Sequence, residues 1–127
     1  MHKVKKILIV DDDADILSVL QESISEINFV EILSAQDGME ALKILEKNKI
    51  DLLITDIRMP NLDGISLILE VRKNYPTPPI IISTGNQDTL KESKQLDVDG
   101  FFEKPFKMND LISCVEKLLA MKELEQK

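Results

Sequence analysis

The chain has 127 residues, enough for one substantial hydrophobic core, and its 43% hydrophobic and 31% charged content is that of an ordinary globular domain. Its formal net charge of −7 argues against nucleic acid as a direct partner, because phosphate binding requires a basic face. No apolar run is long enough to span a bilayer, the start is unlike a signal peptide, and there is one cysteine. We therefore expect a cytoplasmic protein without membrane contact, whose partners are proteins or small cations.

Short apolar runs alternate with amphipathic runs along the chain. The near-continuous apolar runs suit parallel strands that are covered on both faces. These strands are expected at residues 7–10, 30–35, 52–54, 80–82 and 100–104. The amphipathic runs repeat apolar residues with the helical period, and Asp13 or Asp15 is a candidate cap for the first helix. The helices are expected at residues 16–27, 38–48, 64–74, 88–96 and 108–127. Five strands alternating with five helices predict an α/β fold with a doubly wound parallel sheet.

Polar side chains follow these strands at their carboxyl ends, the edge where such folds bind ligands. They are three acids, two hydroxyls and an amine: Asp11, Asp12, Asp56, Ser83, Thr84 and Lys104. Acids gathered in one place repel each other unless a cation lies among them, and Mg²⁺ suits a few carboxylates plus water. A lysine and a hydroxyl suit the oxygens of a phosphoryl group, and a carboxylate can be the nucleophile that accepts it. The residues alone therefore predict phosphoryl transfer onto an aspartate.

Four segments of the chain carry a resemblance to a known family. ILIVDDDADI, DLLITDIRMPNLDG, PPIIISTG and FFEKPF, in that order, resemble the motifs of the receiver domain (CheY-like) of bacterial two-component response regulators. The resemblance implies a flavodoxin-like (βα)5 fold with the strand order 2-1-3-4-5. It also implies a receiver domain at residues 1–121, followed by a charged helix end or tail at residues 122–127.

The resemblance implies roles for the acids at the strand ends. Asp56 matches the phosphoacceptor. Asp11 and Asp12 match the acidic pair that holds Mg²⁺ together with Asp56, with Asp12 as the direct ligand of the two and Asp11 acting through water. The family's remaining protein ligand is a backbone carbonyl two residues past the phosphoacceptor, which is Arg58 in this sequence.

The resemblance also implies roles for residues at the last two strands. Thr84 matches the switch hydroxyl that bonds the acyl phosphate, and Lys104 matches the lysine that pairs with it. Pro105 follows in what resembles the family's cis linkage, and Phe101 occupies the position of the switch aromatic. The residues that would flank the phosphoryl group are Arg58, Gly85 and Asn86.

Several of these positions have a competing interpretation. Ser83 competes with Thr84 for the switch role, but the spacing from Asp56 favours Thr84, with Ser83 facing the other side of the strand. Phe101 and Phe102 point to opposite faces and either could belong to the core; we expect Phe101 to be partly mobile and Phe102 to be buried. The residues interpreted as structural are Asp51, Asp63 and Cys114.

The resemblance implies a signalling function. A sensor histidine kinase or a histidine phosphotransfer protein would phosphorylate Asp56, and a downstream protein target would bind the surface formed by residues 88–96, 100–104 and the last helix. The domain would be a monomer or a phosphorylation-dependent dimer, and it would catalyse only its own phosphotransfer and dephosphorylation. Residues 84–104 form a segment shorter than is usual in the family, by about half a helical turn.

Three other interpretations compete. A Mg²⁺-dependent phosphatase that uses Asp56 as its nucleophile would share the acids, hydroxyl and lysine, but it would place a second acid where Arg58 stands. A module that binds partners without phosphorylation is disfavoured by the intact acids and lysine. The chain could also be a receiver piece of a longer regulator or hybrid kinase rather than a stand-alone receiver.

Overall fold

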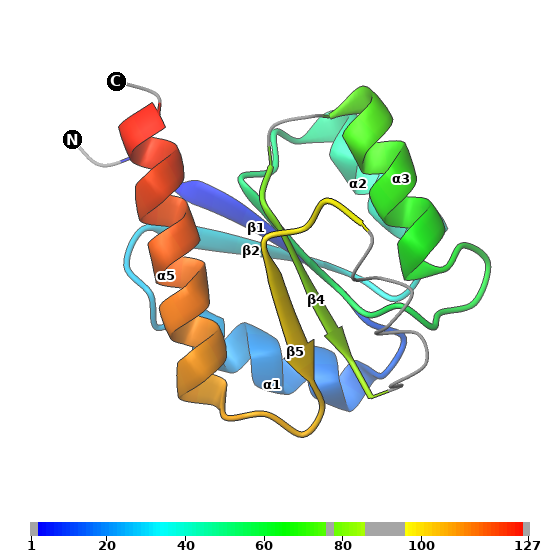
Figure 1. Cartoon of the computed structure of the whole chain (residues 1–127), viewed down its shortest axis with the longest axis horizontal. Helices are drawn as coiled ribbons and strands as arrows, with labels where there is room; N and C mark the ends of the chain where they lie inside the picture. The colour runs from blue at the N-terminus through cyan, green and yellow to red at the C-terminus, as the bar shows by residue number, and fades with distance from the viewer. Residues whose placement is uncertain (1–2, 76–77, 86–95, 126–127) are drawn as a thin grey trace.

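The computed structural model describes residues 3–75, 78–85 and 96–125. In that part of the chain, five parallel strands form one sheet in the order β2-β1-β3-β4-β5, so the predicted fold class and strand order are confirmed (Figure 1). The strands are β1 (Lys5–Val10), β2 (Val30–Ala35), β3 (Leu52–Thr55), β4 (Ile80–Thr84) and β5 (Gly100–Glu103). The described helices are α1 (Ala14–Ile24), α2 (Gly38–Lys47), α3 (Gly64–Asn74) and α5 (Met108–Glu125). Residues 88–95 of the expected fourth helix lie outside the described residues, so the labels pass from α3 to α5.

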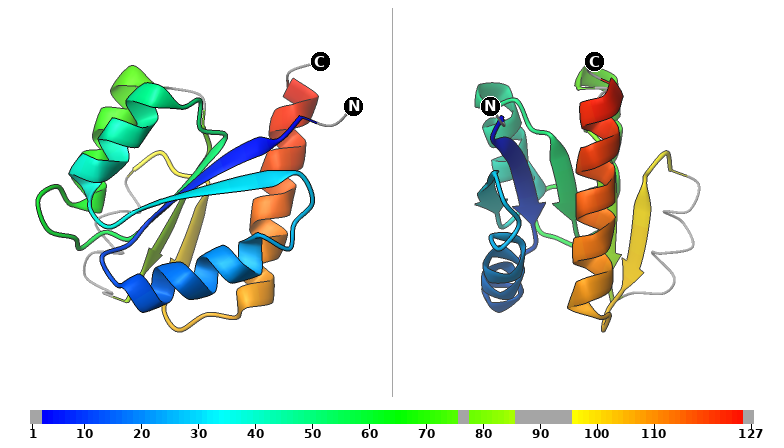
Figure 2. Two further views of the ribbon diagram at one scale, coloured as in Figure 1. Left: turned by 180° about the vertical axis from the view of Figure 1, so that it is seen from behind. Right: turned by 90° about the vertical axis from the view of Figure 1, so that its left-hand side faces the viewer.

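The sheet divides the core into two layers. On β1, Leu8 and Val10 belong to the layer that also contains buried residues of α2 and α3, whereas Ile7 and Ile9 belong to the layer with those of α1 and α5. The two pairs of helices accordingly cover opposite faces of the sheet (Figure 2). Because successive side chains of a strand point to opposite faces, a strand covered on both faces has a nearly continuous apolar sequence.

The burial of each strand follows its place in the sheet. Every residue of the central strands β3 and β4 is buried, which explains why both strands are apolar up to the hydroxyl residues at their carboxyl ends. On the edge strand β5, Phe101 and Phe102 are both only partly buried and pack into opposite layers. The expectation that Phe102 is buried is therefore wrong, because an edge strand has a neighbouring strand on one side only. The Phe102 ring instead lies against Phe106, with the ring centroids 5.4 Å apart.

The first helix ends sooner than the sequence predicts. α1 closes at Ile24, and the Ser25 N–H donates to the Gln21 carbonyl at 2.9 Å. Ile27 lies in the turn that follows, where its N–H donates to the Ile24 carbonyl at 3.0 Å. Its side chain nevertheless packs against the core layer of α1 and α5. The apolar residues of the sequence therefore keep the helical spacing beyond the end of α1, because the turn leaves Ile27 on the face that the helix packs against the core.

The residues that the sequence analysis interpreted as structural make contacts that stabilise the fold. The Asp51 carboxylate accepts a hydrogen bond from the Lys6 N–H at 2.8 Å and so ties the start of β3 to β1. Asp63 caps α3 by accepting from the Ser66 N–H at 2.8 Å. Cys114 packs against the layer of α1 and α5, and burial raises the pKa of its thiol. A high pKa keeps the sulfur as the unreactive thiol, as a packing role requires.

The last helix passes the expected domain boundary without interruption. α5 runs from Met108 through residue 121 to Glu125. The division of the chain at residue 121 stays a prediction. Among the described residues, none of the helices combines the length and the apolar character needed to cross a membrane.

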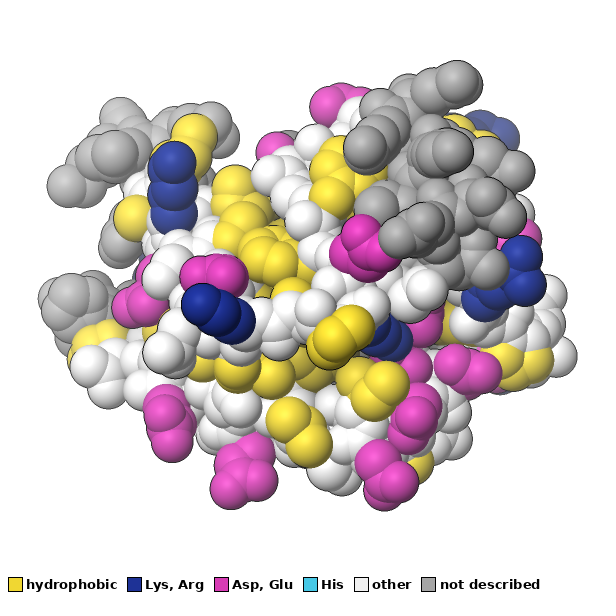
Figure 3. All heavy atoms as spheres, turned by 60° about the horizontal axis from the view of Figure 1, so that its bottom comes forward, with side chains coloured by type: hydrophobic (Ala, Val, Ile, Leu, Met, Phe, Trp, Pro, Cys, Tyr) yellow, Lys and Arg dark blue, Asp and Glu magenta, His cyan; other side chains and the backbone are white. Residues whose placement is uncertain are grey.

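An apolar groove lies between α1 and the segment that joins β5 to α5. Its volume is about 330 Å³. Figure 3 looks toward this end of the molecule and shows hydrophobic side chains gathered between acidic ones. Asp15 and Lys104 contribute to the walls of the groove, and its apolar lining consists of Ile16, Val19, Leu20, Pro105, Phe106 and Met108.

Candidate functional site

Three carboxylates meet at the carboxyl edge of the sheet. Oxygen atoms of Asp11, Asp12 and Asp56 all lie within 4.8 Å of one another. The strand pairing brings them there, because the Asp56 N–H donates to the Val10 carbonyl at 3.0 Å and the Asp11 N–H donates to the Ala35 carbonyl at 3.1 Å. The backbone hydrogen bonds of the parallel sheet thus continue one residue past β1 and β3. They place Asp11, which follows β1, beside Asp56, which follows β3.

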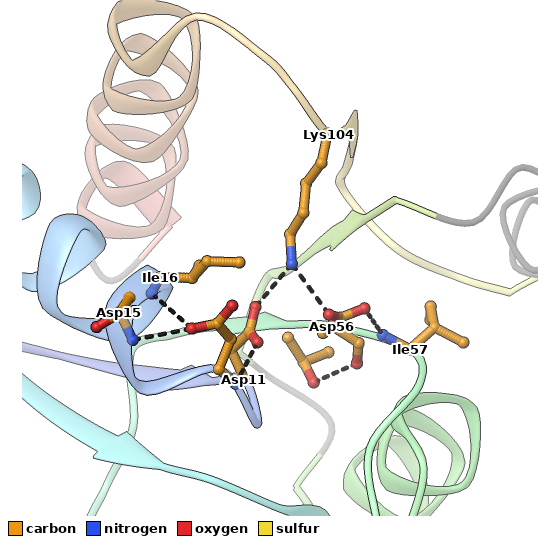
Figure 4. Close-up of polar contacts among 8 residues, drawn as sticks. Asp11, Asp15, Ile16, Asp56, Ile57 and Lys104 are labelled. Carbon is orange, nitrogen blue, oxygen red and sulfur yellow. Dashed lines mark hydrogen bonds and ion pairs between the residues drawn. The ribbon is translucent and has the colours of Figure 1, made fainter.

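Lys104 connects two of the three acids. Its Nζ donates to Asp11 Oδ2 at 2.8 Å and to Asp56 Oδ2 at 3.0 Å (Figure 4). The side chain of Asp11 is 3% exposed and that of Asp56 is 12% exposed, so both ion pairs are largely removed from water. β5 ends at Glu103, one residue before the predicted end, and the Lys104 N–H still donates to the Thr84 carbonyl at 2.9 Å. That hydrogen bond fixes the backbone position from which the Lys104 side chain extends into the site.

The ionisation of the site reflects this proximity. Burial raises the pKa of Asp11, although the hydrogen bonds from Lys104 and from the Asp13 N–H oppose the rise. Burial lowers the pKa of Lys104, but its hydrogen bonds to Asp11 and Asp56 outweigh burial, so the pKa of the ammonium is raised above 10.5. The buried Asp11 carboxylate therefore depends on a cation, and Lys104 supplies a positive charge at neutral pH.

The three consecutive acids after β1 do three different things. Asp11 is buried, and its Oδ1 accepts from the Asp13 N–H at 2.9 Å. Asp12 is exposed beside it. Asp13 is the N-cap of α1, because its Oδ1 accepts from the Asp15 N–H at 2.9 Å and from the Ile16 N–H at 3.3 Å (Figure 4). Of the two candidate caps, Asp13 is thus the one that the structure uses.

The segment after Asp56 leaves no room for a side chain at residue 64. Asp56 Oδ1 accepts from the Ile57 N–H at 2.6 Å, and the Ile57 carbonyl accepts from the Gly64 N–H at 2.7 Å. A Cβ on Gly64 would lie 2.0 Å from the Asp56 carbonyl oxygen. The start of α3 therefore packs directly on the backbone of Asp56. This requirement for glycine at residue 64 was not identified from the sequence.

The two hydroxyls at the end of β4 lie on opposite faces of the sheet. Ser83 alternates with Ile82, whose side chain lies in the layer of α2 and α3, and so faces the layer of α1 and α5. Thr84 consequently faces the same side as Ile82 and Phe101. Both hydroxyl residues are buried, and Ser83 Oγ has no hydrogen-bond partner among the described residues.

The remaining predicted residues lie around this edge. Gly85 is exposed after β4, and the described atom that an added Cβ would meet is the Lys104 Cβ, at 3.9 Å. Arg58 is exposed in the segment between β3 and α3. The peptide bond between Lys104 and Pro105 is cis, as expected. Asn86 lies outside the described residues.

The donor set fits a hard divalent cation. The cluster offers only carboxylate oxygens from Asp11, Asp12 and Asp56, and oxygen ligands are those that Mg²⁺ prefers. Their spacing within 4.8 Å suits one small ion, and Lys104 already places one positive charge against two of them. The arrangement is thus an acidic pocket of the kind that holds Mg²⁺, in which an ammonium contacts two of the carboxylates.

The family follows from comparison with known proteins. Residues 7–116 match the family model described as the response regulator receiver domain. The chain therefore belongs to the response regulator receiver domains (CheY-like) of two-component signalling systems. Members of this family are normally phosphoacceptor signalling domains rather than classical enzymes, and they partner with histidine kinases.

Particular relatives agree with this assignment. The chain is 32% identical over 122 residues to the alkaline phosphatase synthesis transcriptional regulatory protein PhoP of Bacillus subtilis, covering 94% of this chain and 50% of PhoP. It therefore spans about half the length of that relative. The response regulator TrrA of Thermotoga maritima, solved in complex with Mg²⁺-BeF, is 34% identical with a TM-score of 0.81, covering 90% of this chain and 98% of TrrA. The REC domain of the response regulator AraT of Geobacillus stearothermophilus is 34% identical with a TM-score of 0.85, and the match covers 98% of this chain and 99% of the AraT domain.

Proposed function

We propose that this receiver domain accepts a phosphoryl group on Asp56 from a sensor histidine kinase or a histidine phosphotransfer protein. The observation that carries the proposal is the position of the Asp56 carboxylate. It lies within 4.8 Å of Asp11 and Asp12, contacts Lys104 at 3.0 Å and keeps 12% of its side chain exposed. The acid is therefore held in a charged pocket and is still reachable by a phosphodonor.

In the proposed reaction, a carboxylate oxygen of Asp56 attacks the phosphorus of a phosphohistidine. The bond from phosphorus to the imidazole nitrogen breaks, the imidazole leaves, and an acyl phosphate forms on Asp56. Lys104 then binds an oxygen of the phosphoryl group with an ammonium that is charged at neutral pH. Hydrolysis of the acyl phosphate by water restores the free carboxylate.

The acids around Asp56 would hold the metal ion. Mg²⁺, when bound, neutralises negative charge on the phosphoryl oxygens. The direct protein ligands that we assign to it are the carboxylates of Asp12 and Asp56 and the backbone carbonyl of Arg58, and the Asp11 carboxylate would act through water. Arg58, Gly85 and Asn86 flank the phosphoryl group in this proposal. We place the domain in the cytoplasm.

Thr84 and Phe101 would carry the change from the site to the surface. They face the same side of the sheet, which supports a coupled movement of the two side chains. When the Thr84 hydroxyl bonds the acyl phosphate, it moves toward Asp56 and leaves space that Phe101 fills. The surface of β5, α5 and residues 88–96 then changes its fit to a downstream protein.

The apolar groove beside the site supports a protein as the phosphodonor. Lys104 belongs both to the acidic pocket and to the wall of the groove between α1 and the segment entering α5. A helix that packs its apolar face in this groove would bring a histidine on the same helix toward Asp56. A small phosphodonor needs no such surface.

Phosphorylation with acetyl phosphate and Mg²⁺ tests the proposal directly. We expect intact-mass spectrometry to show one added phosphoryl group on the wild-type protein and none on Asp56→Asn. Asp13→Asn is the matched control, because it also converts an acid of this edge to an amide but asparagine retains the helix cap. An adduct that persists in Asp56→Asn would remove Asp56 from its assigned role.

A further inference from the structure

The segment from Asp56 to Gly64, which joins β3 to α3, is held firmly at both ends. At its start, Asp56 bonds to Lys104 and to its own neighbour Ile57. At its end, the Gly64 N–H donates to the Ile57 carbonyl at 2.7 Å. The residues between them, including Arg58, form a loop whose course must be fixed by other contacts.

The middle of this loop is tied to the start of α2. Asn61 Nδ2 donates to Asp37 Oδ2 at 2.8 Å, across 24 positions of sequence. Asn61 has a φ of 68°, in the left-handed region that asparagine and glycine tolerate best. The chain therefore bends at the residue whose amide makes the bond.

A backbone contact reinforces the side-chain bond. The Gly38 N–H donates to the Leu62 carbonyl at 3.2 Å. A Cβ on Gly38 would lie 2.4 Å from that carbonyl oxygen and 2.8 Å from the Leu62 Cβ. Only glycine allows the loop to approach the helix so closely, so the two neighbouring contacts form one junction.

Asp37 is itself fixed in place. Its Oδ1 accepts from the Glu40 N–H at 2.8 Å and caps α2, which leaves Oδ2 for Asn61. These hydrogen bonds, chiefly that from the Glu40 N–H, lower the pKa of Asp37 below 3.8, so the carboxylate is charged at neutral pH. One carboxylate thus joins a rigid helix start to the loop.

We propose that Asp37 and Asn61 form a latch that positions the loop following Asp56, and thereby raises the Mg²⁺ affinity and the phosphorylation rate of the acidic pocket. Neither side chain touches the pocket, so both are positioning residues. Arg58, whose carbonyl we assign to the ion, lies between the anchored Asp56 and the latched Asn61 in the sequence. The inference rests on the proposed function, because it concerns how the same pocket is held.

Two variants remove the hydrogen bond between Asp37 and Asn61 and keep the neighbouring backbone conformation or helix cap. Asn61→Gly keeps a residue that accepts a positive φ but removes the amide. Asp37→Ser keeps a side-chain oxygen for the cap of α2 but removes the oxygen that bonds Asn61. Asn74→Ala is the matched control, because it removes a similar amide-to-carboxylate bond, from Asn74 to Glu70 at 3.0 Å, at the other end of α3.

The test measures Mg²⁺ binding by calorimetry, amide hydrogen exchange at Arg58 and Met59, and phosphorylation by acetyl phosphate. We expect each latch variant to raise the Mg²⁺ dissociation constant by roughly 10-fold, as the loss of a supporting partner does in metal sites. The two loop amides should exchange faster, and the double variant should be no worse than either single one. Asn74→Ala should match the wild type.

Unchanged Mg²⁺ affinity in both latch variants would overturn the inference, even if their melting temperatures fall, since lower stability alone indicates a merely structural bond. Additive effects of the two substitutions on the Mg²⁺ dissociation constant would also overturn it, because each substitution removes the same hydrogen bond between Asp37 and Asn61. A wild-type protein that binds Mg²⁺ but is not phosphorylated would contradict the proposed function instead, and Mg²⁺ affinity would still decide the latch.

Discussion

Lys104 balances the charge of the acidic pocket before any metal ion arrives. Its ammonium contacts Asp11, whose side chain is 3% exposed, and Asp56, whose side chain is 12% exposed. Neither acid is well solvated, so each depends on the lysine. A cation that binds the same carboxylates must share them with Lys104, which links the position of the lysine to occupation of the site.

Lys104→Ala should therefore destabilise the protein most when divalent ions are absent. We expect a loss of about 1–3 kcal/mol in the free energy of unfolding, because the variant leaves Asp11 buried without its cation. Saturating Mg²⁺ should recover part of that loss. Urea unfolding with and without Mg²⁺ checks both statements, and equal stability of variant and wild type in chelator would contradict the first.

Ser83 and Thr84 are neighbours with different expected roles. Ser83 Oγ is buried with no hydrogen-bond partner among the described residues, so Ser83→Ala should raise the free energy of unfolding by about 1 kcal/mol. It should leave phosphorylation and the response of the partner unchanged. Thr84→Ala should still be phosphorylated but should lose the change in partner affinity.

Chemical unfolding and a partner-binding assay on phosphorylated protein compare the two variants. A Thr84→Ala protein that keeps the full affinity change would contradict the switch role. A Ser83→Ala protein that loses it would reverse the assignment of the two hydroxyls.

At the scale of elements, the start of α3 depends on the absence of a side chain at Gly64. Gly64→Ala would place a methyl group 2.0 Å from the Asp56 carbonyl oxygen, so the helix or the loop must move. We expect a destabilisation of about 3 kcal/mol together with slower phosphorylation. Gly85→Ala is the matched control, since among the described residues its Cβ would make one ordinary contact, with the Lys104 Cβ at 3.9 Å. The stability of this variant should change by less than about 0.5 kcal/mol. Equal melting temperatures of the two variants would contradict the close packing.

The elements also show which features local sequence can indicate. The uninterrupted apolar runs of β3 and β4 predicted strands with both faces covered, and their complete burial agrees. The burial of Phe102 was predicted wrongly, because on the edge strand β5 both phenylalanines are only partly covered, each by a different layer. The end of α1 was also misplaced, because Ile27 continues the apolar face from a turn.

At the scale of the whole molecule, the sheet order explains why acids that are far apart in sequence meet. β1 lies beside β3, so Asp11 and Asp56 follow adjacent strands, and the sequence sufficed to place them at one edge. The contact of Asp37 with Asn61 could not be predicted, because no period or motif relates the start of α2 to a loop 24 residues away. The close approach of Gly64 to Asp56 likewise depends on the packing of α3 against the site.

Mg²⁺ should stabilise the whole domain, because an ion that binds only the folded pocket shifts the unfolding equilibrium. A concentration 100 times the dissociation constant should add about 2.7 kcal/mol to the free energy of unfolding. Asp12→Ala should lose most of this gain, because it removes the exposed carboxylate of the cluster. Thermal unfolding at constant ionic strength measures the effect, and an equal gain in Asp12→Ala would count against the metal assignment.

The most direct test of the central claim is a crystal structure of the protein with Mg²⁺ and a beryllofluoride group in place of the phosphoryl group. We expect an ion among Asp11, Asp12 and Asp56 and the fluoride group on the Asp56 carboxylate, with Lys104 turned toward it. A structure at saturating concentrations in which Lys104 still bonds both Asp11 and Asp56, with neither ion nor fluoride present, would contradict the account.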